Sequence, residues 1–470
     1  MALDRVQNYP WLFHWFLAAV PERLLVRVPG LPSAITDFLH AVAVGAVAML
    51  FSDGSWSVFA LAAGLFLFSS GVLSFGIGPR SYEVTPRPVG EFFVSFLVLA
   101  IAIFPDQPLL ALLFASVAGG MSLLASKFAA QVLLFGLPLL GMLTLDPVPV
   151  LVLASSLLVA VVMSGGRYLT VARGQIAHLR TYKRDILSTH LVLRYRNDWR
   201  VLFADLSALL RARGRADATL VKRIALAFMT NAVIQLVFRN AILLLLLVLA
   251  ALQAAGPISS SIKGADERQL VLISWIVAMF IVFVITSSRR FGFLGESERY
   301  LEYAAPATAI LLAPMLLVSE TVWAVAFAAI IGIVHYAQAL AFMGLNRRRI
   351  ENNLEVAHVI HLLDTLDPTK TALPIPMQTV AFAFAWRCSA RFCIAMDFEV
   401  WFEDFQKIYS IYPYPSEDIN MWVREHKAGL AVIRRAGAKE REFEEVISKI
   451  YPMILDGQSY AVYDLSTPIT

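Results

Sequence analysis

The first 345 residues alternate between long apolar runs and short polar connections. A run of about 18 or more apolar residues is typical of a membrane-spanning helix, because a hydrocarbon layer of ~30 Å needs about 20 residues at 1.5 Å each. Lipid offers no hydrogen-bond partners to the backbone, so these runs are predicted to be helices. We predict ten spans, at residues 35–51, 57–76, 91–104, 108–126, 128–144, 149–165, 236–256, 269–287, 304–318 and 321–343.

The basic residues of the connections fall on one side of this predicted bundle. The connections on that side carry twenty-two Lys and Arg, thirteen of them between residues 166 and 223. The opposite connections hold two basic and six acidic residues. Connections rich in Lys and Arg stay in the cytoplasm, so we predict a multi-pass protein of the cell inner (plasma) membrane with both termini in the cytoplasm.

The amino-acid composition also favours a membrane protein. The chain is 58% hydrophobic and 16% charged, whereas a soluble globular domain has about 25% charged residues. Its two cysteines, Cys388 and Cys393, provide neither a disulfide framework nor a cysteine-rich metal site. His178, Asp185 and His190 are too widely spaced to predict a metal site, and the sequence identifies no cofactor.

Residues 1–34 precede the first predicted span and lack the composition of a cleavable signal peptide. Trp11 and Trp15 are four residues apart, beside His14. This spacing suits a helix that lies in the membrane interface with its aromatic rings at headgroup depth. The alternative is a helix packed against the bundle.

Two of the predicted cytoplasmic connections have similar sequences. Residues 75–86 read FGIGPRSYEVTP, and residues 291–306 read FGFLGESERYLEYAAP. Each begins with Phe-Gly, contains Arg-x-x-Glu with a tyrosine inside, and ends at a proline that opens the next span. The similarity suggests that spans one to four and seven to ten form a parallel repeat, and transporters often place their site where repeats meet.

These two connections supply the candidate ligand-binding residues. They are Arg80, Tyr82 and Glu83 in the first connection, and Glu296, Glu298, Arg299, Tyr300 and Glu302 in the second. The arginines could hold a phosphate bidentately, and the glutamates could bind a metal or act as a base. In the structural alternative, Arg and Glu pair on one helical turn or across the two connections, and the tyrosines lie at the membrane interface.

Ionisable side chains within the predicted spans are rare. His40 in the first span and His335 in the tenth are the candidates for a proton or ion pathway. Each is equally interpretable as a hydrogen-bonded packing residue. No Asp or Glu is predicted near the middle of the membrane, which weakens the case for ion-coupled transport.

The connection at residues 166–223 is helical in period and has a net charge of +9. One helical face carries Leu202, Leu206, Leu209 and Leu210. We predict that this basic loop contacts anionic lipid headgroups, where each basic residue contributes about 1 kcal/mol. Nucleic acid is not predicted as a partner, because the loop is tethered to the membrane and has no recognised motif.

The apolar residues 224–256 are too long for one span and are interrupted at Arg239 and Asn240. We interpret residues 218–235 as a helix near the cytoplasmic surface. Arg239 is expected to extend towards the headgroups.

Beyond residue 350 no run is long enough to span a membrane. Helices and strands alternate there, which predicts a small α/β domain with a largely parallel sheet. Strands are expected at TALPIP, CIAMDF and GLAVIRR, with a final hairpin at MILDGQSYAVYDL. Glycine-rich phosphate-binding motifs are absent. The loop after TALPIP and the segment YPYPSED at 412–418 are either ligand-binding loops or proline-rich turns.

The predicted fold class is a polytopic α-helical membrane protein of about ten transmembrane helices with a small C-terminal cytoplasmic α/β domain. Its parts are an N-terminal interfacial helix (1–34), a first bundle half (35–165), the basic cytoplasmic loop (166–223), a second bundle half (224–345) and a soluble α/β domain (351–470).

The leading functional hypothesis is the handling of a lipid-linked or phosphate-bearing envelope precursor, a polysaccharide or glycolipid intermediate, at the cytoplasmic leaflet. The chain would serve as an enzyme subunit or as a flippase-like partner. One alternative is a secondary transporter of a small solute built on the parallel repeat. Another is a membrane scaffold that docks a soluble enzyme through residues 351–470. No catalytic residue is identified, and enzyme activity is left open.

Overall fold

The computed structural model describes most of the chain. The described residues are 10–28, 30–73, 85–186, 199–211, 220, 224, 231–255, 266–288, 290–295, 297–318, 321–351, 354–384, 388–393, 409–411, 414–435 and 437–469. They fall into two compact units. We call Pro10–Val171 with Leu191–Gly344 the helical unit, and the unit that contains Leu345–Thr470 the sheet unit. The second unit also includes Ala172–His190.

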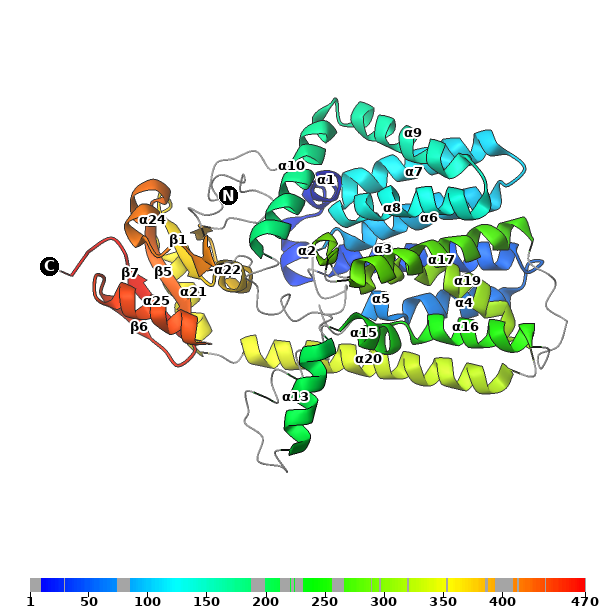
Figure 1. Ribbon diagram of the computed structural model, residues 1–470. Helices are drawn as coiled ribbons and strands as arrows, with labels where there is room; N and C mark the ends of the chain where they lie inside the picture. The colour runs from blue at the N-terminus through cyan, green and yellow to red at the C-terminus, as the bar shows by residue number, and fades with distance from the viewer. Residues whose placement is uncertain are drawn as a thin grey trace. The chain divides into compact units, whose positions relative to one another are not determined.

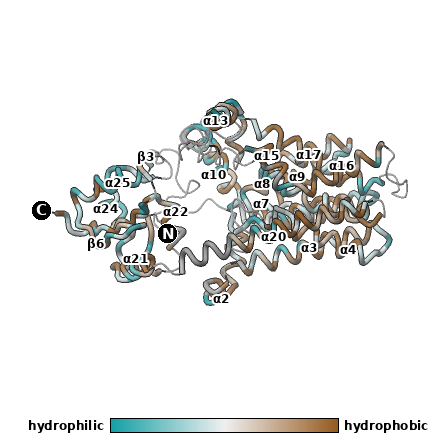
Figure 2. The backbone as a smooth tube through the Cα atoms, turned by 90° about the horizontal axis from the view of Figure 1, so that it is seen from below, coloured by the Kyte–Doolittle hydropathy of each residue, from teal (hydrophilic) through white to brown (hydrophobic). Residues whose placement is uncertain are grey.

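The helical unit is a bundle of apolar helices (Figures 1 and 2). Each predicted span coincides with one of them. They are α3 (Leu31–Leu50), α4 (Trp56–Leu67), α6 (Arg87–Ile103), α7 (Pro108–Ala125), α8 (Lys127–Thr144), α9 (Val148–Met163), α16 (Ala241–Ala254), α17 (Glu267–Ser287), α19 (Ala305–Leu316) and α20 (Val322–Glu351). Proline stands in the first turn of α3, α6, α7, α9 and α19, where its missing N–H has no helical partner to lose.

The prediction of ten membrane spans is wrong for the described residues. Five helices there are long and apolar enough to cross a membrane, namely α3, α7, α8, α17 and the Val322–Ala341 part of α20. The number rises to six if α9 and α10 (Arg167–Thr181), which meet at a bend of 118°, form one span. Among the other runs, those predicted at 57–76, 236–256 and 304–318 include residues outside the helix, because α4, α16 and α19 have 12, 14 and 12 residues.

Shorter helices complete the described part of this unit. They are α1 (Leu12–Ala18), α2 (Glu22–Arg27), α5 (Ser70–Leu73), α13 (Trp199–Arg211), α15 (Ala232–Arg239), the 3₁₀ turn η3 (Gly292–Leu294) and α18 (Glu298–Glu302). The π-helix η2 (Tyr182–Ile186), which continues α10, belongs to the sheet unit. In α1, Leu12 and Phe13 are buried while Trp15 is 61% exposed. This helix therefore packs one face inward and leaves an aromatic residue on the other.

The predicted leucine face of the basic loop is only partly correct. In α13, Leu202 is buried, Leu206 and Leu209 are half-buried, and Leu210 is 80% exposed. Asp205 shares the buried face with Leu202. The helix is therefore oriented by Leu202 and Asp205, and Leu210 lies outside the packed face.

The sheet unit contains a five-stranded sheet in the order β2-β1-β5-β7-β6. The strands are β1 (Thr371–Ile375), β2 (Arg391–Phe392), β5 (Ala428–Arg434), β6 (Met453–Asp456) and β7 (Tyr460–Asp464). The pairs β1–β2 and β1–β5 are parallel, but β5–β7 and β6–β7 are antiparallel. The largely parallel sheet predicted from the sequence is therefore a mixed sheet, because the terminal hairpin adds both of its strands at one edge.

Helices cover this sheet. They are α21 (Leu354–Asp364), α22 (Met377–Phe384), α24 (Ile419–His426) and α25 (Ala438–Ser448), and β3 (Tyr409–Ile411) pairs with β4 (Tyr414–Pro415) in a separate ribbon. The predicted strands at TALPIP and GLAVIRR and the final hairpin are confirmed. The strand predicted at CIAMDF is not: β2 precedes Cys393, and residues 394–398 lie outside the described part of the chain. Asp418 rather than Ser416 caps α24, accepting from Met421 N–H.

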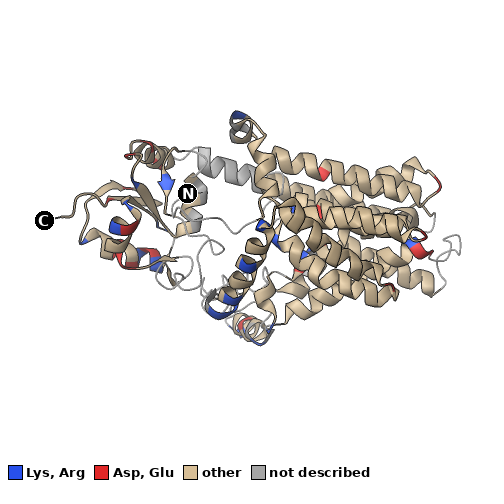
Figure 3. Ribbon diagram, turned by 90° about the horizontal axis from the view of Figure 1, so that it is seen from above, with Lys and Arg blue, Asp and Glu red and all other residues tan. Residues whose placement is uncertain are grey.

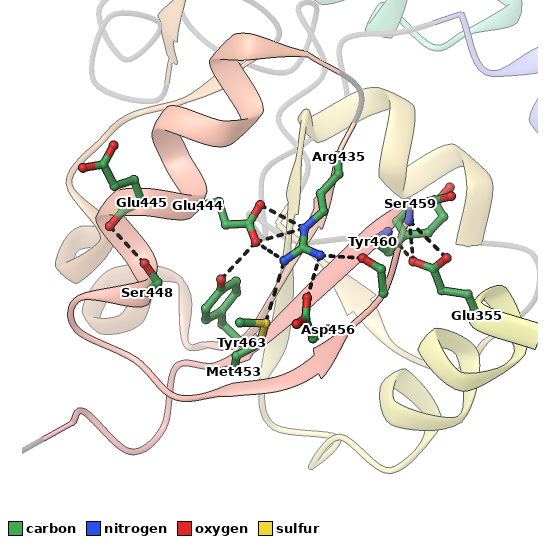
Figure 4. A network of polar contacts seen from close by, with 11 residues as sticks. Glu355, Arg435, Glu444, Glu445, Ser448, Met453, Asp456, Ser459, Tyr460 and Tyr463 are labelled. Carbon is green, nitrogen blue, oxygen red and sulfur yellow. Dashed lines mark hydrogen bonds and ion pairs between the residues drawn. The ribbon is translucent and has the colours of Figure 1, made fainter.

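A polar network centred on Arg435 closes the hairpin edge of the sheet unit (Figure 4). The Arg435 guanidinium donates to the carboxylates of Glu444 in α25 and Asp456 in β6, and to the Gly457 carbonyl. The Glu355 carboxylate of α21 accepts from the backbone N–H of Ser459 at 2.8 Å. These contacts tie α21 and α25 to the same turn of the chain.

Candidate functional site

The second of the two similar connections is folded into the helical unit. Ser297, Glu298, Tyr300, Leu301 and Glu302 are buried, although four of the five carry a polar or ionisable group. Arg299 is half-buried. The other predicted members, Glu296 and the first-connection residues Arg80, Tyr82 and Glu83, lie outside the described residues.

The two glutamates of α18 form ion pairs with arginines from distant parts of the chain. Glu302 Oε2 lies 3.0 Å from a guanidinium nitrogen of Arg87, at the start of α6. Glu298 Oε1 lies 4.0 Å from Arg239, at the end of α15. The second pair is longer than a hydrogen bond. Arg239 was expected to extend towards the headgroups, but its side chain is 14% exposed and points to α18. That expectation was therefore wrong, because a buried carboxylate supplies a closer partner.

Tyr300 and its neighbours anchor α18 to two long helices. The Tyr300 ring packs on Phe128 of α8 with centroids 4.7 Å apart, and its hydroxyl lies 3.3 Å from Gln131 Oε1. Burial raises the pKa of this phenol well above its usual value. Trp275 of α17 donates from Nε1 to the Tyr303 carbonyl at 2.9 Å. The end of α18 is thus fixed by buried contacts with α8 and α17.

A small pocket adjoins α18, with a volume of about 20 Å³. It is lined by Leu65, Ser69, Arg239, Asn240, Ile242, Leu243, Leu301, Glu302, Ala305 and Thr308. Half of these residues are polar and half are apolar. The lining comes mainly from the ends of α4, α16 and α19, and α19 packs against both of the other two. A space of this size has room for about one water molecule.

The two candidate histidines both contact the C-terminal end of α4. His40 of α3 is 1% exposed, and its ring centroid lies 4.3 Å from that of Phe66. His335 of α20 is 7% exposed, and its Nδ1 lies 3.3 Å from the Phe68 carbonyl oxygen. His40 thus makes aromatic packing contacts, and His335 makes a polar contact with a backbone carbonyl.

Sequence reasoning missed two buried carboxylates near His40 in the chain or next to a residue that contacts it. Asp37 of α3 is 3% exposed, one turn before His40, and Glu91 of α6 is 2% exposed, next to Phe92, whose ring contacts His40. Both lie within the predicted spans at 35–51 and 91–104. The signal was present, since carboxylates in membrane helices usually face the bundle interior.

In the sheet unit, the predicted ligand loops do not coincide with a hollow lined by described residues. The Tyr414 hydroxyl in the YPYPSED segment donates to the Glu440 carboxylate of α25 at 3.1 Å. This contact is the kind that a structural turn makes. A hollow of about 230 Å³ lies near the amino ends of β1 and β5, and its polar lining includes Asp367, Lys370, Asp464 and Ser466. Lys370 Nζ is 2.6 Å from Ser466 Oγ. The described residues thus place this hollow away from the predicted loops.

Comparisons with known proteins leave the chain without a family. No protein-family model matches the sequence, and no curated protein has significant similarity to it. Among the residues that the structure describes, no group of three or more His, Cys, Asp or Glu is arranged to hold a metal ion.

Proposed function

We propose that this chain is an integral plasma-membrane protein that handles a lipid-linked or phosphate-bearing envelope precursor, with the pocket beside α18 as the site for the anionic group. The observation that carries this proposal is the lining of the pocket. An arginine, two hydroxyl residues, an asparagine and a glutamate share it with leucine, isoleucine and alanine. The glutamate, Glu302, is paired with Arg87 at 3.0 Å. A mixed lining of this kind suits an amphiphile, whose phosphate needs donors and whose chain needs apolar contacts.

Arg239 is the residue that would recognise the phosphate. Its guanidinium is planar and permanently charged, and it can donate two parallel hydrogen bonds to one phosphate. In this proposal a phosphate oxygen replaces the Glu298 carboxylate, which lies 4.0 Å from Arg239. Asn240 and Ser69 line the same pocket and carry further donors. The hydroxyl of Thr308, which also lines it, donates to the Ala304 carbonyl.

Binding would require α18 to move. The pocket of about 20 Å³ holds a water molecule but not a phosphate group. A ligand that takes Arg239 from Glu298 loosens one side of α18, while the Arg87–Glu302 pair at 3.0 Å holds the other. The proposed cycle is therefore an exchange of partners at Arg239, with α18 withdrawing as the phosphate enters.

Orientation and localisation follow the distribution of basic residues. Helix α8 begins with Lys127, α10 begins with Arg167, and α15 ends with Arg239. These positions belong to the predicted basic side. We propose that this side, with the pocket and both chain termini, faces the cytoplasm.

Polyprenyl phosphate binding tests the proposal. The full-length chain in lipid nanodiscs is titrated with polyprenyl phosphate, with the uncharged polyprenol and with inorganic phosphate, and bound species are counted by native mass spectrometry. We expect the phosphate ester to bind at least tenfold more tightly than the alcohol, because a charge-assisted hydrogen bond contributes about 1.5–3 kcal/mol. Arg239→Ala should remove this preference, and Arg239→Lys should restore part of it.

Arg290→Ala is the matched control. Arg290 follows α17 at the same end of that helix as α18, but it is exposed and outside the pocket. Its loss should leave the preference unchanged. Equal binding of the phosphate and the alcohol, or equal losses in the Arg239 and Arg290 variants, would refute the proposed site. Tight binding of inorganic phosphate without the lipid would instead favour a solute transporter.

A further inference from the structure

The exposed face of α10 combines arginine with large apolar side chains. Leu169 and Ile176 are 53% and 52% exposed, and Arg173 and Arg180 are exposed between and beyond them. These four residues stand at positions i, i+4, i+7 and i+11, so they form a single stripe on a helix of 3.6 residues per turn. Tyr168, Val171 and Thr181 are buried on the other side of the helix.

The direction of α10 is set by the turn before it. Gly165 and Gly166 have φ values of +57° and +85°, which side chains with a Cβ rarely adopt. The Gly166 N–H donates to the Val161 carbonyl at 2.8 Å, and Ser164 Oγ accepts from the Tyr168 N–H at 2.9 Å, capping the new helix. The axis of α10 is bent by 118° from that of α9. A helix attached to an apolar helix at such an angle runs nearer to the plane of a membrane than to its normal.

The net positive charge of α10 and η2 favours contact with an anionic surface. Residues 167–186 hold five Lys and Arg and one acidic residue, Asp185. Figure 3 shows that charged residues are sparse along the apolar helices, so this segment stands out from them. Arginines beside exposed Leu and Ile fit an anionic lipid leaflet, where the guanidinium groups meet headgroup phosphates and the aliphatic side chains enter the acyl boundary.

We propose that α10 is an interfacial helix that binds anionic phospholipid through Leu169, Arg173, Ile176 and Arg180. This assigns the lipid contact predicted for the basic loop as a whole to a specific stripe on α10. The inference is independent of the proposed phosphate pocket, because none of the four residues lines that pocket.

Depth-dependent fluorescence quenching tests the proposal. Full-length protein with Ile176→Cys, in a background of Cys388→Ser and Cys393→Ser, is labelled with bimane and reconstituted into vesicles. The vesicles contain either phosphatidylcholine alone or phosphatidylcholine with phosphatidylglycerol. Lipids carry a nitroxide near the headgroup or deep in the acyl chain. We expect strong quenching by the shallow nitroxide in anionic vesicles, weak quenching by the deep one, and a loss of the shallow signal at high salt.

Charge reversal provides the matched pair of variants. Arg173→Glu with Arg180→Glu should abolish most of the shallow quenching, since each arginine near an anionic surface changes the contact equilibrium about fivefold. Arg441→Glu with Lys449→Glu makes the same change in net charge at exposed positions, one in α25 and one directly after it, and should have no effect.

The proposal is wrong if quenching is equal in neutral and anionic vesicles, or if both double variants behave alike. Strong quenching by the deep nitroxide would also overturn it, and would make α10 part of a membrane span. Circular dichroism of each labelled protein confirms that the helical content is unchanged, so that loss of quenching reports lipid contact.

Discussion

Gly136 in α8 faces α17 so closely that a methyl group has no room there. A Cβ at this position would lie 2.6 Å from Met279 Cε and 2.7 Å and 2.8 Å from two ring carbons of Trp275. The methionine methyl is the end of a flexible side chain and can move. The indole is 1% exposed and donates to the Tyr303 carbonyl, so it cannot shift without breaking a buried hydrogen bond. Gly136→Ala should therefore destabilise the helical unit.

The expected loss is about 1–3 kcal/mol. Overpacking a close-packed core costs about 1–3 kcal/mol, and a strained or broken indole hydrogen bond adds about 1 kcal/mol. Alanine gains about 1 kcal/mol over glycine in a helix interior, which offsets part of this. Gly64 in α4 is the matched control, because no atom lies within 4 Å of a Cβ built there. Gly64→Ala should keep the propensity gain alone, so the two variants should differ by about 2–4 kcal/mol.

Unfolding of the full-length chain by SDS in mixed micelles, followed by circular dichroism, measures this difference. Trp275→Phe removes the ring carbons that meet the new methyl group, so adding it to Gly136→Ala should shrink the penalty of the alanine. If Gly136→Ala and Gly64→Ala are equally stable, the indole relaxes freely. The contact between α8 and α17 then does not constrain the end of α18.

Three further predictions concern the ion pairs and the buried thiol. Arg87→Met should lower the free energy of unfolding by about 2–4 kcal/mol, because it leaves Glu302 buried without this partner. Adding Glu302→Leu should recover much of that loss in the same SDS titration. Additive losses in the double variant would contradict this. Arg435→Ala should lower the free energy of unfolding of the sheet unit by about 2–3 kcal/mol. The loss should appear as a lower urea concentration at the midpoint of unfolding, followed through the sheet signal. An unchanged midpoint would mean that the network in Figure 4 does not stabilise the sheet unit. Burial raises the pKa of the Cys393 thiol from 9.0 to about 11. The folded state therefore favours the protonated thiol over the thiolate, and this preference stabilises the sheet unit fully below pH 9. This contribution should be lost as the pH rises from 9 to about 11, and Cys393→Ser should flatten that part of the stability profile.

The positions of the apolar helices could be predicted from the sequence, but their lengths could not. Long apolar runs locate α3, α7 and α17 within a few residues. The run predicted at 57–76 failed in length, because α4 ends at Leu67 and a turn follows at Phe68 and Ser69. Hydropathy does not separate an apolar turn from an apolar helix, so the span count came out too high.

The ion-pair partners in the candidate site could not be predicted from short-range sequence patterns. Arg87 and Glu302 are 215 residues apart in the chain, and no spacing rule connects them. The sequence suggested that Arg-x-x-Glu would pair within one turn or across the similar connections. The Arg87–Glu302 contact joins the residue after the first connection to the second, which resembles the latter possibility. Asp37 and Glu91 were readable as carboxylates inside apolar runs, but their burial depends on how α3 and α6 pack.

The short helices around the pocket have a consequence for the lipid beside them. At 1.5 Å per residue, the 12 residues of α4 and α19 measure about 18 Å, and the 14 residues of α16 about 21 Å. A hydrocarbon layer is ~30 Å thick. Where hydrophobic length falls short, the bilayer thins or its headgroups sink to meet the protein. Around α4, α16 and α19 the barrier that a charged headgroup meets in crossing from one leaflet to the other would then be narrower than elsewhere in the membrane.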